Sequence, residues 1–362
     1  MNKKGLSSLE VAAIVNELQS LVKGRISQVY HQEKKELLFQ MHAPDEGKKL
    51  VKLVPGKYLC FTKKKEVPLK PSSFCMQLRK YLNNAFVKRI YQKDSERIVI
   101  FELERSKEKY LLILELYSKG NLILTDDKLM IIGALESQLW KERTVKVKME
   151  YVFPLSSFDW KNINLSGLQK ILKKSEKKNL ATALAIEVGL GGLYAEEVCK
   201  LSAVDSQKLP PDADEKDIKQ IVKTVKDLLK KIEKPQGCVY EEQITPFPLK
   251  GEKFSFETET YSEAVDTLNP FKTISPYERK IKTLEKTIRE QKEALESHQN
   301  KIDLNAKKGE LIYEKYTQLQ KLLEIVKELR KTKEWKEVEK ELKKEQKIKT
   351  VNLKTRKIIL DL

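Results

Sequence analysis

The sequence predicts an α+β protein: an antiparallel β-sandwich or half-open barrel with flanking helices, then a helical region and a long coiled-coil arm. Three observations predict this order. Short apolar runs separated by turn residues fill residues 1–150, helical spacing dominates 151–270, and apolar residues alternate at intervals of three and four in 271–349. We place domain boundaries at these changes, and residues 350–362 begin a further domain.

The first domain is predicted to contain two helices and two meanders of short strands. One helix begins at a Ser7 or Ser8 cap and ends at Gly24, and a basic loop at 63–70 leads into a second helix, at 72–85. That helix carries Arg79 and Lys80, which we expect to face a polyanion, while Phe74, Met76, Leu78 and Leu82 face the core. The predicted strands are 25–31, 36–42, 48–54, 57–62, 86–92, 97–104, 109–117, 121–126 and 130–135.

The most specific local pattern is ATALAIEVGLGGLYAEEVCKLSAVD at 181–205, which predicts a helix, a glycine turn and a second helix. In this helix-hairpin-helix form, backbone N–H groups around Gly189, Gly191 and Gly192 can hold a phosphate. The alternative is a plain corner between two helices whose glycines only allow close packing. Near the end of the region we expect short strands at 243–249 and 253–258 and a helix at 261–271.

The arm has an apolar seam that Gly309 is expected to interrupt and that resumes at Ile312. A coiled coil needs a partner helix, so we expect a return helix or a second chain. Residues 350–362 predict a β-hairpin, which alone is marginally stable in water. We therefore expect the chain to be a fragment, or a second chain to complete it.

The net charge of the chain indicates which classes of partner it can bind. The formal net charge is +18 and charged residues make up 34% of the chain, which favours polyanionic partners, either nucleic acid or an anionic membrane surface. No apolar run is long enough to predict a membrane-spanning helix, so the membrane is the weaker choice.

Catalytic and metal-binding patterns do not appear in the sequence. The four cysteines are scattered, the three histidines lack ligand spacing, and neither a phosphate-binding Walker loop nor a Gly-x-Ser-x-Gly elbow is present. We predict no metal, no cofactor and no enzymatic activity. Reduced core cysteines are typical of a cytoplasmic protein.

Glu96 and Arg97 stand together where a turn at Asp94 and Ser95 becomes a strand. Arginine offers a bidentate fork to a phosphate or a base edge, and a neighbouring carboxylate can orient that fork or accept from a base amine or ribose hydroxyl. By itself, the pair is better explained as a solvated charge pair of little energetic value.

Six blocks together resemble the NFACT family of ribosome-associated quality-control factors, in the order found there. They are SSFCMQLRKYLNN, Q-x-x-S-E-R-I-V-I-F, ELYSKGNLILTD, GLGGLYAEEVC, TYSEAVD and GELIYEKY. The resemblance covers essentially the whole chain. It implies a first domain similar to that of formamidopyrimidine-DNA glycosylases, a helix-hairpin-helix domain, a coiled-coil arm, and a truncation just inside the middle domain that omits the RNA-binding NFACT-R domain.

The resemblance also implies a function. Such proteins bind large ribosomal subunits that carry stalled peptidyl-tRNA and recruit tRNA, typically alanyl-tRNA, for mRNA-independent tailing of the stalled chain. The family's Asp–Arg pair for tRNA handling falls on Glu96 and Arg97, and its acidic residue in the first helix falls on Glu10. Glutamate stands at both positions where the family usually has aspartate, which lengthens each side chain by one methylene.

Two rival functions come from the same likeness. A DNA glycosylase of this fold uses an N-terminal proline nucleophile, but residue 2 is Asn2 and no four-cysteine zinc finger follows. A fibronectin-binding surface protein is suggested by an older family name, but the N-terminus lacks the pattern of a secretion signal.

Overall fold

The computed structural model describes two compact units, residues 1–272 and 273–362. Each is considered by itself. The residues whose structure is described are 5–32, 35–65, 70–139, 143–154, 158–241, 243–268, 276–332, 338, 348–352 and 357–360. Parts of the predicted basic loop (66–69) and of the predicted arm (333–337 and 339–347) lie outside them.

The first unit begins with α1 (Ser8–Glu17) and the 3-10 turn η1 (Leu18–Leu21), and a second helix, α2 (Ser73–Leu82), separates two runs of strands. The strands are β1 (Arg25–His31), β2 (Leu37–Ala43), β3 (Gly47–Val54), β4 (Tyr58–Phe61), β5 (Phe86–Gln92), β6 (Ile98–Arg105), β7 (Glu108–Glu115), β8 (Asn121–Asp126) and β9 (Ile131–Ala134). The short strands β10 (Gln138–Leu139) and β11 (Thr144–Val145) form a separate pair. The predicted strands are confirmed, with ends shifted by a residue or so.

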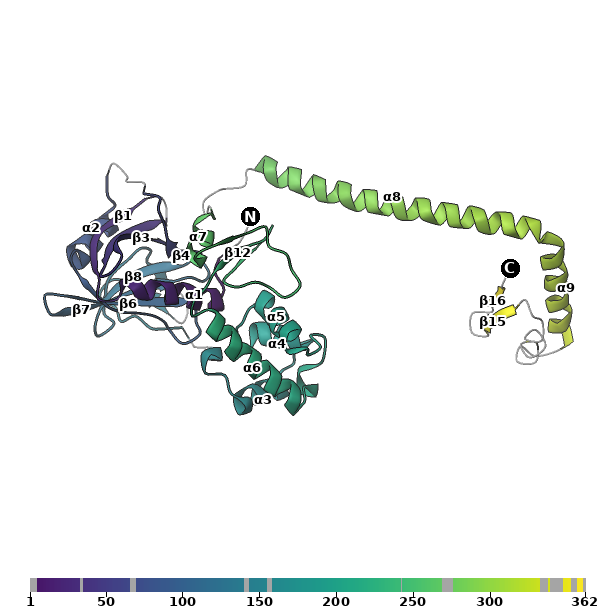
Figure 1. The fold of residues 1–362 in the computed structure, drawn as a ribbon, viewed down its shortest axis with the longest axis horizontal. Helices are drawn as coiled ribbons and strands as arrows, with labels where there is room; N and C mark the ends of the chain where they lie inside the picture. The colour runs from purple at the N-terminus through teal and green to yellow at the C-terminus, as the bar shows by residue number, and fades with distance from the viewer. Residues whose placement is uncertain are drawn as a thin grey trace. The chain divides into compact units, whose positions relative to one another are not determined.

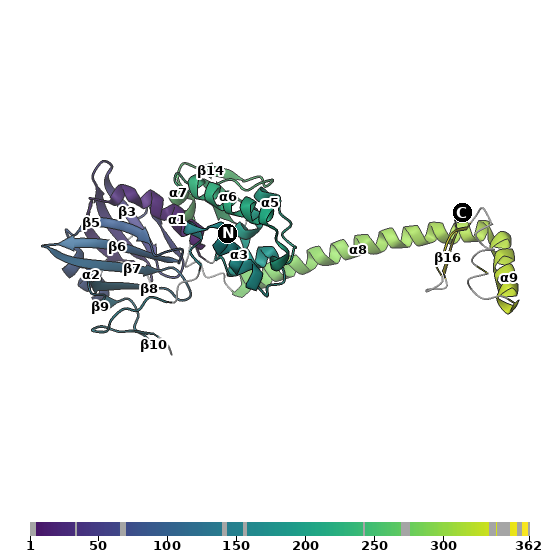
Figure 2. The ribbon, with the colours of Figure 1, turned by 90° about the horizontal axis from the view of Figure 1, so that it is seen from below.

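These strands form one large antiparallel sheet in the order β4-β3-β2-β1-β5-β6-β7-β8-β9. Figure 2 shows β5, β6, β7 and β8 in sequence across it. Only Arg25 and Phe86 pair where β1 meets β5, so the sheet has two halves joined by a narrow seam. Buried side chains of both halves, including Phe39 and Phe101, belong to one hydrophobic core with α1 and α2. The α+β class and the antiparallel pairing are therefore confirmed, and the strands predicted as a sandwich or half-open barrel form one large sheet.

Both helices of this domain begin at serine caps. The Ser7 side chain accepts from the Glu10 N–H while the Glu10 carboxylate accepts from the Ser7 N–H, which is a capping box. Ser72 caps α2 by accepting from Cys75 N–H at 3.1 Å. The prediction that Met76 faces the core is wrong: its side chain is 52% exposed, because α2 buries a narrower stripe that contains Phe74, Leu78 and Leu82.

The remainder of the first unit is mainly helical, and α3 to α6 gather in one bundle (Figure 1). Its elements are η2 (Trp160–Asn162), α3 (Leu165–Lys174), α4 (Leu180–Ile186), α5 (Gly192–Ser202), η3 (Pro210–Asp212), α6 (Glu215–Lys231), β12 (Gly237–Val239), β13 (Ile244–Thr245), β14 (Phe256–Thr258) and α7 (Tyr261–Asp266).

Helix α7 packs back against α1 and β4. The Glu17 carboxylate accepts from the N–H groups of Tyr261, at 2.6 Å, and Ser262, at 3.0 Å, so α1 supplies a cap for α7. Lys52 of β3 forms a largely buried ion pair with Asp266 at the other end of α7. Two charged contacts thus attach this late segment to α1 and to β3.

The second unit contains α8 (Pro276–Glu314), α9 (Tyr316–Thr332), β15 (Ile348–Asn352) and β16 (Lys357–Leu360). The hairpin is confirmed, since β15 and β16 pair antiparallel. Gly309, which was predicted to interrupt the apolar seam, does not end the helix: α8 continues through it and ends at Glu314. Apolar side chains such as Leu295 and Ile302 are largely exposed along α8, and the coiled coil stays a prediction.

Candidate nucleic-acid interface

A surface pocket of about 330 Å³ brings together three segments that are far apart in the sequence. They are the start of α1, the turn before β6 and the start of α5. Four predicted site residues line this pocket: Arg97 and Glu10, predicted from the family resemblance, and Gly191 and Gly192, predicted from the helix-hairpin-helix pattern. The other lining residues are Gly5, Leu6, Ser7, Leu193, Tyr194 and Gln243.

The turn between β5 and β6 presents Arg97. The Arg97 carbonyl accepts from the Leu116 N–H at 2.8 Å, and the Glu96 N–H donates to the Lys93 carbonyl at 2.9 Å, so the backbone is fixed on both sides. The Arg97 side chain is exposed, and within the described part of the chain its guanidinium has no ion-pair or hydrogen-bond partner. Glu96 is half-buried, does not line the pocket and makes no ion pair with Arg97, although both residues are described.

A buried polar network holds this turn against α1. Gln92 Nε2 donates to the Ser8 carbonyl at 2.9 Å and to the Glu96 carbonyl at 2.8 Å. The Ser8 hydroxyl donates to the Ser95 carbonyl and accepts from Trp160 Nε1 at 3.0 Å. Sequence reasoning missed this network because its members are up to 152 residues apart and no local spacing links them.

Lys161, beside this network, is a cation that the sequence did not single out. Burial lowers the pKa of its ammonium from 10.5 to about 8, although the carboxylates of Asp159 and Asp94 act in the opposite direction. The Lys161 backbone N–H lies 3.4 Å from the Ser95 hydroxyl. A positive charge that is partly lost near neutral pH therefore lies next to the turn of Arg97.

The Lys161 charge predicts a pH effect on stability. Because its pKa is about 8 when folded and near 10.5 when unfolded, the protonated form opposes folding below about pH 8, and this opposition is relieved as the pH rises towards 10.5. The free energy of unfolding of the wild type should thus rise between pH 7.5 and 9.5 relative to that of Lys161→Met, measured by urea denaturation. Parallel pH profiles for the two proteins would contradict this.

The start of α5 offers backbone donors to the pocket. The first helical bond runs from the Ala195 N–H to the Gly191 carbonyl at 3.0 Å, so the N–H groups of residues 192–194 precede it. Gly191 is the N-cap, at φ +80°, and no side chain caps the helix. Gly189 also has a positive φ, +86°, in the turn after α4, but it does not line the pocket. These features suit an anion at Gly191 and Gly192.

Glu10 lines the pocket but is only 1% exposed. Its Oε2 accepts from the Ser7 N–H at 2.8 Å, and its Oε1 accepts from the Tyr194 hydroxyl at 2.7 Å. Burial and this carboxylate raise the pKa of Tyr194 well above its usual value, so the tyrosine stays a donor. Glu10 therefore connects the start of α1 to the start of α5.

The structure does not bring Arg79 and Lys80 into this pocket. Arg79 Nε donates to the Val29 carbonyl at 2.7 Å, and its guanidinium lies 5.6 Å from the centre of the Tyr30 ring, so Arg79 attaches α2 to β1. Lys80 is exposed on α2.

The described part of the chain contains neither a candidate metal-binding cluster nor a candidate membrane-spanning helix. No group of three His, Cys, Asp or Glu side chains there is placed to hold a metal ion, and no helix there is long and apolar enough to span a bilayer. The four cysteines are buried and unpaired, and burial raises the pKa of Cys199 to about 12.

The archaeal Rqc2 homologue aRqcH of Methanocaldococcus jannaschii is 29% identical over an alignment of 361 positions that covers 92% of this chain and 53% of that protein. The ribosome quality control complex subunit NEMF homologue of Drosophila melanogaster is 28% identical over an alignment of 252 positions that covers 68% of this chain and 25% of that protein. This chain thus spans about half or less of these relatives.

Among solved structures, the N-terminal part of the fibronectin/fibrinogen-binding protein from Streptococcus suis has a TM-score of 0.61 at 20% identity, covering 73% of this chain and 98% of that one. This likeness shows a shared fold. A family model described as the NFACT N-terminal and middle domains matches residues 7–358. Nearly the whole chain is matched, and it therefore belongs to the NFACT family.

Proposed function

We propose that this chain is the tRNA-binding N-terminal part of a ribosome quality-control factor and that the pocket of Arg97 is where tRNA is held. One observation carries the proposal: an exposed guanidinium that pairs with no described residue, and a helix start that no described side chain caps, line the same pocket in a chain of net charge +18. A guanidinium reads a phosphate or base edge with two parallel donors, and a helix start adds backbone N–H groups for a phosphate.

The relatives' names support the wider role, because the fly protein is named a homologue of a ribosome quality control complex subunit and the archaeal protein a homologue of Rqc2. In this role the factor acts in the cytoplasm on the large ribosomal subunit with stalled peptidyl-tRNA. It positions (alanyl-)tRNA for mRNA-independent C-terminal tailing. Peptide-bond chemistry belongs to the ribosome, so the chain needs no catalytic residue, metal or cofactor.

Within the pocket the residues have different tasks. Arg97 and the N–H groups at Gly191 and Gly192 contact the RNA. Glu10, whose two carboxylate oxygens are occupied by Ser7 and Tyr194, is a positioning residue that holds the two helix starts together. Glu96 lies on the same turn but outside the pocket, and there its carboxylate can accept a hydrogen bond from a ribose hydroxyl or a base amine. Lys80 and the basic loop before α2 add a non-specific electrostatic contribution.

A charge placed at the start of α5 tests the proposal. A Cβ added at Gly192 meets no atom within 4 Å, so side chains fit there. Gly192→Asp should leave the free energy of unfolding unchanged or slightly higher, because an acid at a helix start is favourable. It should lower tRNA affinity by about fivefold to tenfold, since a carboxylate near a phosphate costs on the order of 1 kcal/mol.

The matched control is Gly192→Asn, which has nearly the same shape without the charge and should bind tRNA close to normally. Fluorescence anisotropy with labelled tRNA at fixed salt would measure all three affinities. Equal losses of tRNA affinity in the two variants would mean that the bulk of the side chain matters rather than its charge. Equal affinities in all three proteins would mean that the RNA does not contact this helix start.

A further inference from the structure

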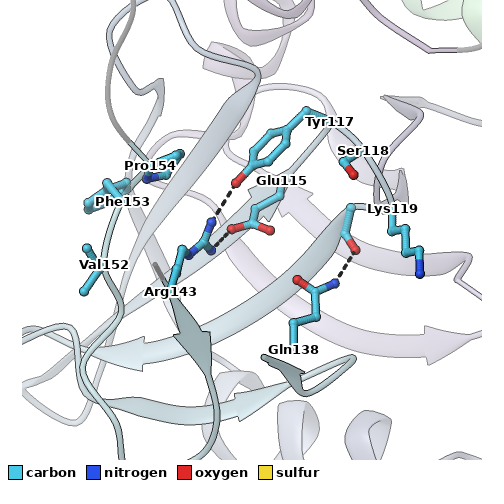
Figure 3. Close-up of a pocket in the computed structure, with 10 residues that line it drawn as sticks. Glu115, Tyr117, Ser118, Lys119, Gln138, Arg143, Val152, Phe153 and Pro154 are labelled. Carbon is cyan, nitrogen blue, oxygen red and sulfur yellow. Dashed lines mark hydrogen bonds and ion pairs between the residues drawn. The ribbon is translucent and has the colours of Figure 1, made fainter. Parts of the chain in front are cut away.

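A second, larger pocket of about 510 Å³ opens where β7 ends and β8 begins (Figure 3). Its lining combines an apolar wall with a small polar group. The wall is the extended segment Val152, Phe153 and Pro154, and the polar side is formed by Glu115, Tyr117 and Arg143. Nothing in the tRNA site described above uses these residues.

The polar side is preorganised. Arg143 forms an ion pair with Glu115 and donates from Nη1 to the Tyr117 hydroxyl at 2.8 Å, as Figure 3 shows. The Tyr151 hydroxyl donates to Glu115 Oε1 at 2.8 Å, and the Arg143 guanidinium lies 4.8 Å from the centre of the Tyr151 ring. Burial raises the pKa of Tyr117 to about 12, so its hydroxyl keeps its proton across the physiological range.

One donor of this network is left over. Arg143 Nε is buried and has no hydrogen-bond partner among the residues that the structure describes. A buried polar atom without a partner is costly. The lining also presents the polar side chains of Lys119 and Gln138 beside the apolar wall, so a matching ligand combines polar groups with apolar faces for Val152, Phe153 and Pro154.

A nucleotide matches these requirements. Unpaired bases of RNA are bound by stacking on aromatic rings and guanidinium planes and by hydrogen bonds to their polar edges. Pockets of roughly 300–1,000 Å³ are of the size that takes such small ligands. The exposed Lys119 at the rim supplies a cation for the phosphate, whereas Arg143 is already neutralised by Glu115.

The second pocket lies next to the turn of Arg97. Leu116, whose N–H holds the Arg97 carbonyl at 2.8 Å, stands between Glu115 and Tyr117, and Glu115 pairs with Ile98 across β6 and β7. We propose that this pocket takes an unpaired nucleotide of the RNA that Arg97 holds, with the base against the apolar wall and the phosphate towards Lys119. This inference rests on the proposed function and adds that the second pocket binds a single-stranded part of the RNA.

Mononucleotide binding tests the pocket without tRNA. The four nucleoside 5′-monophosphates and ribose 5-phosphate would be titrated into the full chain and followed by isothermal calorimetry. Val152 is 56% exposed at the rim, so Val152→Asp introduces a charge without burying it, and Val152→Thr is the neutral control of the same shape. We expect nucleotides to bind the wild type and Val152→Thr alike, and Val152→Asp to bind them about tenfold more weakly.

Several results would overturn the inference: no nucleotide binding, ribose 5-phosphate binding as tightly as the nucleotides, or equal affinities in Val152→Asp and Val152→Thr. Measuring tRNA affinity of Arg97→Ala in parallel separates this failure from that of the proposed function. If Arg97→Ala loses tRNA while nucleotides do not bind, only the second pocket is refuted. If Arg97→Ala binds tRNA normally, the proposed function fails, and with it the assignment of the nucleotide to RNA held at Arg97.

Discussion

Replacing Arg97 with alanine should lower tRNA affinity by about 1–3 kcal/mol, which is roughly fivefold to 150-fold, while the free energy of unfolding stays within about 0.5 kcal/mol of the wild type. The affinity falls because the exposed guanidinium contributes its donors only to a ligand. Stability is kept because the backbone bonds of Arg97 and Glu96, to Leu116 and Lys93, do not involve either side chain. Filter binding at two salt concentrations and urea denaturation would measure the two quantities.

Two further variants make this result specific. Arg97→Lys keeps the charge but removes the two-pronged donor, so an intermediate affinity would indicate bidentate recognition. Arg89→Ala removes another arginine, 65% exposed and paired at 3.6 Å with Glu102 on the neighbouring strand, and should have little effect on tRNA affinity. If Arg97→Ala lost stability but bound tRNA normally, Arg97 would be a structural residue.

Replacing Glu10 with alanine should destabilise the protein by about 2–4 kcal/mol, from the lost capping box and a buried Tyr194 hydroxyl without an acceptor. Urea denaturation followed by tryptophan fluorescence would measure it, because the buried Trp160 indole contacts Ser8 at the start of the same helix. We expect tRNA affinity to fall as well, since the starts of α1 and α5 lose their connection.

Glu10→Gln is the matched control, because its amide oxygen can still accept from Tyr194 or from the Ser7 N–H. We expect it to lose less than half of the stability that Glu10→Ala loses. If Glu10→Ala were as stable as the wild type yet bound no tRNA, Glu10 would touch the RNA directly rather than position the helix starts.

Much of the fold could be predicted from local sequence. The strands were found because turn residues such as Gly47 and Gly56, both at positive φ, separate alternating apolar runs. The cap at Ser7 could be predicted because a helix cap links residues only three positions apart in the sequence. A prediction that depended on packing was wrong at Met76, whose side chain is 52% exposed on α2. Gly309 weakens a helix by too little to end α8.

The candidate site was only partly predictable. Glycines at a helix turn and an acid–arginine pair are visible in the sequence, but no spacing predicts that Arg97, Glu10 and Gly192 share a pocket. The network of Ser8, Gln92, Ser95 and Trp160 and the lowered pKa of Lys161 depend on burial, which only the folded chain creates. For Glu10 the sequence and the structure differ in the opposite way. The family resemblance places Glu10 at the tRNA site, whereas in the structure its carboxylate accepts hydrogen bonds from Ser7 and Tyr194.

A crosslink from the pocket of Arg97 to tRNA tests most directly whether tRNA is held there. A benzoylphenylalanine would be placed at Leu193, which lines the pocket, or at Leu209, which is 54% exposed outside it, and each protein would be irradiated with labelled tRNA. If tRNA is held in this pocket, position 193 gives a crosslinked species that Arg97→Ala abolishes, and position 209 gives none. A crosslink from 209 alone, or one at 193 that survives the loss of Arg97, would contradict it.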